Sequence, residues 1–290
     1  MTLTGLFVPL ITPFDEAGAV ALGALSDLAH RMLDGGAAGL VALGTTAEPS
    51  SLSPAEQRDV AAAVARVCRE RGAPLIVGAA TVPALESLRD LPGAVAALCV
   101  VPPFLRPGEA GVLAHFRQLA AASPVPIVVY HVPYRTGQPL TADALRRLAA
   151  LPGVAGVKFA AGGIDEETIG LMCDVPPGFA VLGGDDVFVS PLLALGAHGA
   201  ILASAHVATG EFAELIEAWH TGDAVRARAL GHRLAPLSRA LFAEPNPTVV
   251  KAVLHERGAI PTAAVRLPLL TAGTDSTDAA LRLSDSLRGD

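Results

Sequence analysis

Eight short apolar runs recur along this chain of 290 residues, and stretches of helical period separate them. Each run is continuously apolar rather than alternating, which is typical of parallel strands buried on both faces. Eight strand–helix units within about 210 residues predict a (β/α)8 barrel, the TIM barrel. The runs lie at residues 5–14, 39–44, 74–80, 97–104, 126–132, 154–161, 179–184 and 199–204.

A doubly wound sheet is the alternative architecture, and it ordinarily carries a glycine-rich nucleotide loop after its first strand. Here the first run leads into TPFDEAGAV, which lacks the GxGxxG pattern, so the barrel is favoured. We expect the catalytic barrel to span residues 1–221 and a C-terminal helical region to span residues 222–290. One intervening helix has clear ends, because Ser53 and Glu56 form a capping-box pattern and Gly72 provides the stop.

Composition excludes several classes of function. The net charge of -7 argues against a nucleic-acid-binding protein, which needs a basic face, and no basic stretch suggests a membrane surface. The apolar runs are shorter than the roughly 18 residues of a membrane span, and the N-terminus lacks the basic region of a signal peptide. Three scattered cysteines predict neither a disulfide framework nor a zinc site. A cytoplasmic protein is expected.

Lys158 is the most informative single residue, because it and Lys251 are the only lysines among 21 basic residues. Strand alternation places its side chain on the face opposite Val157 and Phe159. If that face points into the barrel, burial lowers the pKa of Lys158, and a neutral amine can form a Schiff base with a ketone or aldehyde. A lysine that is merely paired with an inward carboxylate is the alternative.

Two other strand ends carry residues suited to such chemistry. After the fifth run, Tyr130 can pass protons to a forming imine, and Arg135 offers a bidentate fork for a carboxylate. In GTTAE (44–48), Thr45 and Thr46 can form a carboxylate cradle, although a simple helix cap is the alternative.

Paired aspartates follow the seventh run, at residues 185 and 186. The neighbouring strand ends supply no complementary Asp, Glu or His ligands, and the nearby lysine opposes a cation. We therefore expect these carboxylates to cap a helix or brace a loop, and we expect neither a metal nor another cofactor.

The motifs VPLITPF, GTTAE, YHVPYRTG, GVKFAAG, GGDD and EPNP follow one another in an order and spacing that covers nearly the whole chain. In this they resemble the dihydrodipicolinate synthase/N-acetylneuraminate lyase family of pyruvate-dependent class I aldolases. The resemblance implies a Schiff-base lyase that acts on pyruvate or another 2-keto acid together with an aldehyde. It also implies a homotetramer or homodimer.

By this resemblance Lys158 is the Schiff-base lysine and Tyr130 the proton-transfer tyrosine. Thr45 and Thr46 hold the pyruvate carboxylate, and Thr45 also belongs to the proton relay. Gly184 and Ile201 are expected to line the site through their backbones.

Arg135 favours the synthase pattern, in which an arginine grips the carboxylate of aspartate semialdehyde. Phe104 departs from it, because the synthases carry there a second relay tyrosine that reaches a neighbouring subunit. Three alternatives therefore stay open: a 2-keto-3-deoxy sugar-acid aldolase or dehydratase, an N-acetylneuraminate lyase, and a catalytically silent paralogue that binds a keto acid.

Overall fold

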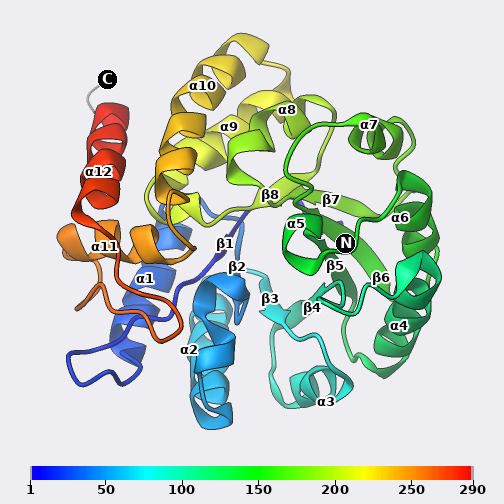
Figure 1. The fold of residues 1–290 in the computed structure, drawn as a ribbon, viewed down its shortest axis with the longest axis horizontal. Helices are drawn as coiled ribbons and strands as arrows, with labels where there is room; N and C mark the ends of the chain where they lie inside the picture. The colour runs from blue at the N-terminus through cyan, green and yellow to red at the C-terminus, as the bar shows by residue number, and fades with distance from the viewer. Residues whose placement is uncertain (1, 289–290) are drawn as a thin grey trace.

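The computed structural model describes residues 2–288 and shows a closed barrel of eight parallel strands (Figure 1). Each strand pairs with the next in the chain, and the last pairs with the first through the register Phe7 to Ile201. The expected (β/α)8 barrel is confirmed. The strands are β1 (Gly5–Pro9), β2 (Gly39–Ala42), β3 (Leu75–Gly78), β4 (Ala94–Val100), β5 (Ile127–His131), β6 (Val154–Phe159), β7 (Ala180–Gly183) and β8 (Gly199–Ile201).

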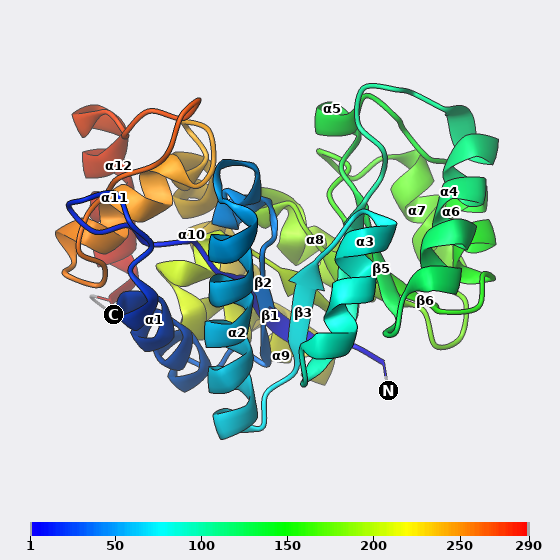
Figure 2. The same cartoon turned by 90° about the horizontal axis from the view of Figure 1, so that it is seen from below.

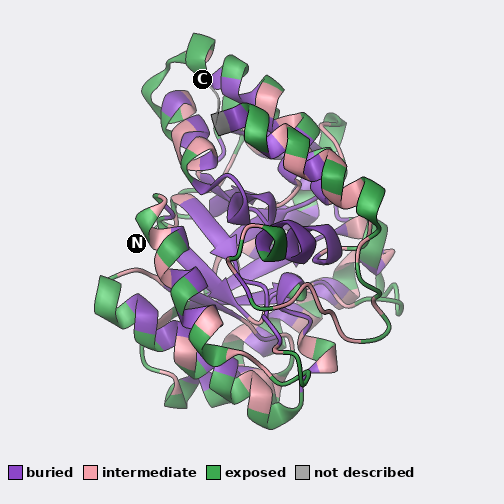
Figure 3. Cartoon of the chain, turned by 90° about the vertical axis from the view of Figure 1, so that its left-hand side faces the viewer, coloured by how far each residue is buried: buried purple, intermediate pink, exposed green. Residues whose placement is uncertain are grey.

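Helices surround the barrel, with one face of each turned to the strands and the other exposed, whereas the strands themselves are buried (Figure 3). The longer barrel helices are α1 (Leu22–Asp34), α2 (Pro54–Arg71), α4 (Gly108–Ala122), α6 (Ala142–Ala149), α7 (Glu166–Cys173) and α9 (Thr209–Thr221). Shorter ones are α3 (Val82–Glu86), α5 (Pro133–Thr136) and α8 (Val189–Ala194), and 3-10 turns are η1 (Thr45–Ala47), η2 (Pro49–Ser51), η3 (Ser87–Asp90), η4 (Asp186–Phe188) and η5 (Ser204–His206).

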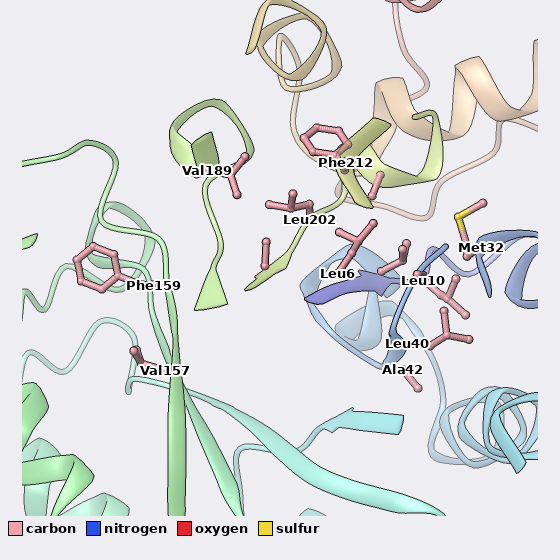
Figure 4. Packing of buried hydrophobic residues seen from close by; sticks show 14 of the residues in the cluster. Leu6, Leu10, Met32, Leu40, Ala42, Val157, Phe159, Val189, Leu202 and Phe212 are labelled. Carbon is pink, nitrogen blue, oxygen red and sulfur yellow. The ribbon is translucent and has the colours of Figure 1, made fainter. Parts of the chain in front are cut away.

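The two faces of each strand pack into separate apolar layers. Side chains such as Phe7 and Leu182 fill the barrel interior. Leu40 of β2 and Met32 of α1 belong to the larger layer between strands and helices, part of which is drawn in Figure 4. Because both faces are buried, continuous apolar runs were the correct signal for these strands.

Helix α2 begins and ends as its sequence predicts. The Ser53 hydroxyl accepts a hydrogen bond from the Glu56 backbone N–H, and the Glu56 carboxylate accepts one from the Ser53 N–H at 2.8 Å. Gly72 closes the helix in the left-handed conformation, with φ of 63°, which glycine adopts without a Cβ penalty.

Two apolar runs, 5–14 and 97–104, extend furthest beyond the ends of their strands. β1 ends at Pro9, and the residues after it are apolar because the C-terminal region covers them: Phe14 is 1% exposed beneath Lys251 and Arg266. β4 ends at Val100, and the chain beyond it leaves the sheet as an exposed loop. Apolar character thus marks burial, whereas hydrogen-bonded pairing decides where a strand ends.

The C-terminal region consists of α10 (Ala224–Leu241), α11 (Thr248–Glu256) and α12 (Thr274–Arg288), which lie together at one side of the barrel (Figures 1 and 2). α10 packs on α9 and α12. The expected boundary after residue 221 falls between α9 and α10 and stays a prediction. Among the described residues, no helix is both long enough and apolar enough to cross a membrane.

Candidate active site

A small pocket opens at the carboxyl ends of the strands, the end at which α5 stands in Figure 2. It is lined by six of the seven residues singled out from the sequence, together with residues of the C-terminal region. The lining residues are Thr45, Thr46, Tyr130, Tyr134, Arg135, Lys158, Gly184, Asp186, Ala203, Phe242 and Asn246. They meet because all parallel strands of a barrel end on the same side.

Lys158 lies inside the barrel as alternation along β6 predicts, with only 7% of the residue exposed. Its neighbour across the strand pairing is Tyr130, and its Nζ lies 4.5 Å from the centre of the Tyr130 ring. Burial lowers the pKa of Lys158 to about 8, although the Asp186 and Asp185 carboxylates act in the opposite direction. Burial therefore makes the neutral amine far more accessible near physiological pH than it is in an exposed lysine.

Gly184 gives the lysine its room. A Cβ at this position would lie 2.8 Å from both Cγ and Cε of Lys158, closer than real Cβ contacts allow. A larger residue here would have to displace the Lys158 side chain, so glycine is favoured by close approach rather than by backbone dihedral angles.

Tyr130 is the second-last residue of β5, its ring lies in the barrel interior, and the residue is 8% exposed. Burial raises the pKa of its hydroxyl, so Tyr130 stays protonated at neutral pH. When a neutral amine adds to a ketone, the former ketone oxygen has to leave the carbon. A protonated phenol beside the amine can donate a proton to that oxygen.

The threonines form a one-turn 3-10 helix, η1, directly after β2. Thr45 is exposed to the pocket, whereas Thr46 is buried and its Oγ1 accepts a hydrogen bond of 2.9 Å from Asn246 Nδ2. The segment after β1 also stabilises this turn, because the Thr12 hydroxyl donates a hydrogen bond of 2.8 Å to the Ala47 carbonyl.

Arg135 lies in α5 at the outer edge of the pocket, and it is exposed. Its guanidinium lies 5.9 Å from the ring centre of Tyr134. An exposed arginine at the pocket entrance can bind the distal carboxylate of a substrate whose other end reaches the lysine.

The two aspartates brace loops, as expected from the sequence. Asp185 accepts hydrogen bonds from the Gly162 N–H at 2.5 Å and from the Tyr134 hydroxyl at 3.3 Å. Asp186 accepts one from the Ser204 N–H at 2.6 Å, and burial raises the pKa of Asp186 to about 6. Within residues 2–288, no three His, Cys, Asp or Glu side chains lie close enough together to hold a metal ion.

Ile201 is the last residue of β8, and its side chain is buried in the same interior layer as Tyr130. The expected role of its backbone stays a prediction, whereas Ala203, two residues further on, is among the residues that line the pocket. Asn246 and Phe242 line the pocket without having been predicted from the sequence, although Asn246 lies in the EPNP motif. Asp186 also lines the pocket, in addition to the bracing role expected of it.

A buried lysine beside a tyrosine at the mouth of a (β/α)8 barrel is the arrangement of a lysine-dependent aldolase, which activates ketones as Schiff bases. The sequence profile of the dihydrodipicolinate synthetase family matches residues 2–285, nearly the whole chain. The chain belongs to this family, and it is therefore an enzyme, a lyase of the class I, Schiff-base type.

Curated relatives of similar length are named 4-hydroxy-tetrahydrodipicolinate synthase. The protein of Neisseria meningitidis serogroup B is 36% identical over 98% of this chain and 100% of its own length. That of Methanothrix thermoacetophila is 36% identical over 96% of this chain and 94% of its own length. Among solved structures, dihydrodipicolinate synthase from Acinetobacter baumannii complexed with pyruvate has a TM-score of 0.92 and 33% identity, covering 98% of this chain and 99% of that one.

Proposed function

We propose that this enzyme condenses pyruvate with aspartate semialdehyde, the reaction of the 4-hydroxy-tetrahydrodipicolinate synthases, and that Lys158 is its nucleophile. Full-length relatives with that name support the reaction. The observation that carries the role of Lys158 is its placement: a desolvated amine with a pKa of about 8, inside the barrel, on the pocket wall beside Tyr130.

The chemistry follows from a neutral amine in a largely closed site. Lys158 attacks the ketone carbon of pyruvate, and the resulting carbinolamine loses water to give an iminium ion. Loss of a proton from the methyl carbon produces an enamine, because the iminium nitrogen takes up the electron pair. The enamine carbon attacks the aldehyde carbon, and the amine of the semialdehyde then displaces Lys158 and closes the ring.

The remaining residues have complementary roles in this proposal. Tyr130 protonates the departing hydroxyl of the carbinolamine, and Thr45 relays protons to it. Thr46 donates a hydrogen bond to the pyruvate carboxylate, and Arg135 binds the carboxylate of the semialdehyde. Gly184 contributes its backbone and the space for the lysine.

Phe104 supports an oligomer with shared sites. It is 88% exposed at the tip of the loop after β4, where the synthases place a tyrosine that enters a neighbouring subunit's site. Leu105 beside it is 81% exposed. Burial of two such apolar side chains against a second copy of the chain would be favourable. We therefore include a cytoplasmic homotetramer or homodimer in the proposal.

Phe104 also favours one second candidate, a 2-keto-3-deoxy sugar-acid aldolase or dehydratase. A phenyl ring cannot carry a proton, whereas it can shape the pocket for a different aldehyde. Arg135 favours the synthase, because a sugar aldehyde has no carboxylate at that position.

Trapping with borohydride tests the nucleophile. Incubation with pyruvate and borohydride should leave a reduced adduct on the peptide that contains Lys158, and Lys158→Arg should abolish it. Since the chain has only one other lysine, Lys251, mass spectrometry assigns the site without ambiguity. An adduct on Lys251, or none, would overturn the mechanism.

The aldehyde is tested separately, by offering pyruvate with aspartate semialdehyde or with sugar aldehydes and identifying the products. Turnover of aspartate semialdehyde supports the synthase. Turnover of sugar aldehydes alone supports the second candidate, and an adduct without any product would identify a silent paralogue.

A further inference from the structure

The second lysine of the chain is even more deeply buried than the first. Lys251 lies in α11 with 0% exposure, and its Nζ donates to Glu48 Oε1 at 2.6 Å and to the Ala264 carbonyl at 2.8 Å. The same ammonium lies 4.1 Å from the centre of the Phe14 ring. All its contacts are thus made within the protein, outside the residues that line the pocket.

Its partner Glu48 directly follows the threonine turn and is 5% exposed. Both carboxylate oxygens are bound from the C-terminal region, since Oε1 accepts from Lys251 and Oε2 from the Arg266 backbone N–H at 2.8 Å. Glu48 has φ of 55°, a left-handed conformation that costs a non-glycine residue strain. The bound carboxylate holds the chain in this conformation, which ends the 3-10 turn.

Arg266 extends the same attachment to the segment that follows. Its guanidinium donates to both carboxylate oxygens of Glu56, at 3.0 and 2.6 Å, and to the Ser51 carbonyl at 2.9 Å. The chain from Glu48 to the first turn of α2 is therefore tied to the C-terminal region at three places.

The other side of the threonine turn is tied by Asn246, which lies between α10 and α11. Its Nδ2 donates to Thr46 Oγ1 at 2.9 Å. An amide NH2 group only donates, so the Thr46 oxygen acts as the acceptor and its hydroxyl proton can point to another acceptor. Thr46 and Asn246 both line the pocket, where a carboxylate would accept that proton.

We propose that the C-terminal region positions the threonine turn for binding the keto-acid carboxylate, through the Lys251–Glu48 ion pair and the Asn246–Thr46 hydrogen bond. Lys251, Glu48 and Asn246 are thus positioning residues. This proposal rests on the proposed function, in which Thr46 binds that carboxylate and Thr45 beside it relays protons. A buried ion pair is a poor source of stability compared with an apolar pair of the same size, whereas its directional bonds define one geometry.

The test replaces the ion pair as a unit, in the variant Glu48→Gln/Lys251→Met, so that no unpaired charge stays buried. The measurement is the pyruvate concentration that gives half-maximal borohydride trapping on Lys158. We expect it to rise by about tenfold to a hundredfold, because small displacements of binding groups have effects of that size. The rate of trapping at saturating pyruvate should change far less, since Lys158 and Tyr130 are untouched.

Arg257→Met/Asp285→Asn is the matched control. It removes a second ion pair of the C-terminal region, 2.8 Å long, between the residue that follows α11 and α12, and this pair does not touch the threonine turn. Half-saturation should be unchanged in this control. If both variants shift it equally, or if neither does, the pair has no positioning role and the inference is wrong.

Asn246→Ala tests the Asn246–Thr46 hydrogen bond. It also tests the positioning role of the C-terminal region if the double variant does not fold. It should raise half-saturating pyruvate by about tenfold with the trapping rate at saturation preserved; an unchanged value would overturn the inference. A wild-type protein that forms no adduct with pyruvate would instead refute the proposed function, so the two failures are distinguishable.

Discussion

At the scale of single residues, the two lysines show that a lowered pKa does not by itself identify a nucleophile. Burial lowers the pKa of Lys158 and that of Lys251 to about 8 alike. Lys251 uses its ammonium protons in bonds to Glu48 and Ala264, whereas Lys158 lies on the wall of the pocket at the carboxyl ends of the strands. Access to the pocket, rather than basicity, is the difference between Lys251 and the lysine that we propose as the nucleophile.

Adduct formation should depend on pH through Lys158. Because only the neutral amine attacks, the trapping rate should rise with pH and level off above the pKa of about 8. In Asp186→Asn the midpoint should move to lower pH, because the Asp186 carboxylate favours the charged amine. Rates measured from pH 6 to 10 check this, and a midpoint that moves upward would contradict it.

Gly184→Ala should slow adduct formation by about tenfold or more, because the new methyl group displaces the Lys158 side chain from its position. Gly163→Ala is the control, since a Cβ there meets no atom within 4 Å. The trapping rate at saturating pyruvate is the measurement. Equal rates in both variants would show that the lysine accommodates the methyl group.

At the scale of elements, the loop after β4 combines a strained backbone with exposed apolar side chains. Phe104 and Arg106 have positive φ, 67° and 44°, although neither is glycine. The loop is held to α5, because the Phe104 N–H donates to the Thr136 carbonyl at 3.2 Å. Strained backbone that presents an exposed phenyl ring is consistent with a contact made by another subunit.

Phe104→Tyr distinguishes the two candidate substrates. In a synthase, a restored hydroxyl should speed condensation with aspartate semialdehyde by about tenfold or more, in line with the effect of general acid–base groups. Leu105→Tyr adds a hydroxyl to the same loop tip at the neighbouring position and should have no such effect. Brisk wild-type condensation that Phe104→Tyr leaves unaltered would show that the relay does not need this hydroxyl.

Arg135→Ala addresses the same question from α5. A synthase should lose the anchor for the semialdehyde carboxylate, so its KM for aspartate semialdehyde should rise by about tenfold or more while half-saturating pyruvate stays unchanged. Steady-state kinetics with each substrate varied in turn provide the measurement. An unchanged KM for the semialdehyde would remove Arg135 from the binding site.

At the scale of the whole molecule, the C-terminal region and the barrel form one structural unit at the pocket. Phe242 and Asn246 from this region line the pocket beside Thr45 and Lys158. The Lys251–Glu48 and Arg266–Glu56 pairs join residues more than 200 positions apart in the sequence. The site is therefore complete only when both regions have folded together.

Lys251→Met should lower the free energy of unfolding by about 3–5 kcal/mol, because it leaves the Glu48 carboxylate buried without its partner. Adding Glu48→Gln should recover most of that loss. Urea unfolding monitored by circular dichroism provides the measurement. If Lys251→Met were as stable as the wild-type protein, Glu48 would have to be hydrated rather than buried.

Local patterns in the sequence were sufficient to predict the strands, the ends of α2 and several side chains that line the pocket. Continuous apolar runs marked all eight strands, because both faces of a barrel strand are buried. Ser53, Glu56 and Gly72 marked the ends of α2, because caps are local hydrogen bonds. Lys158, Tyr130 and Thr46 were recognisable as neighbours, since parallel strands of a closed barrel end on one side.

Only the tertiary structure decided the contacts that join distant segments. Asn246 reaches Thr46, and Lys251 reaches Glu48, across about 200 residues of chain. No periodicity or spacing reports such pairs, because the loops that bring them together are shaped by packing of the whole molecule. The same reason explains why no sequence pattern marked Ala203 as a pocket residue: the register and tilt of closed strands determine which residues emerge at the rim.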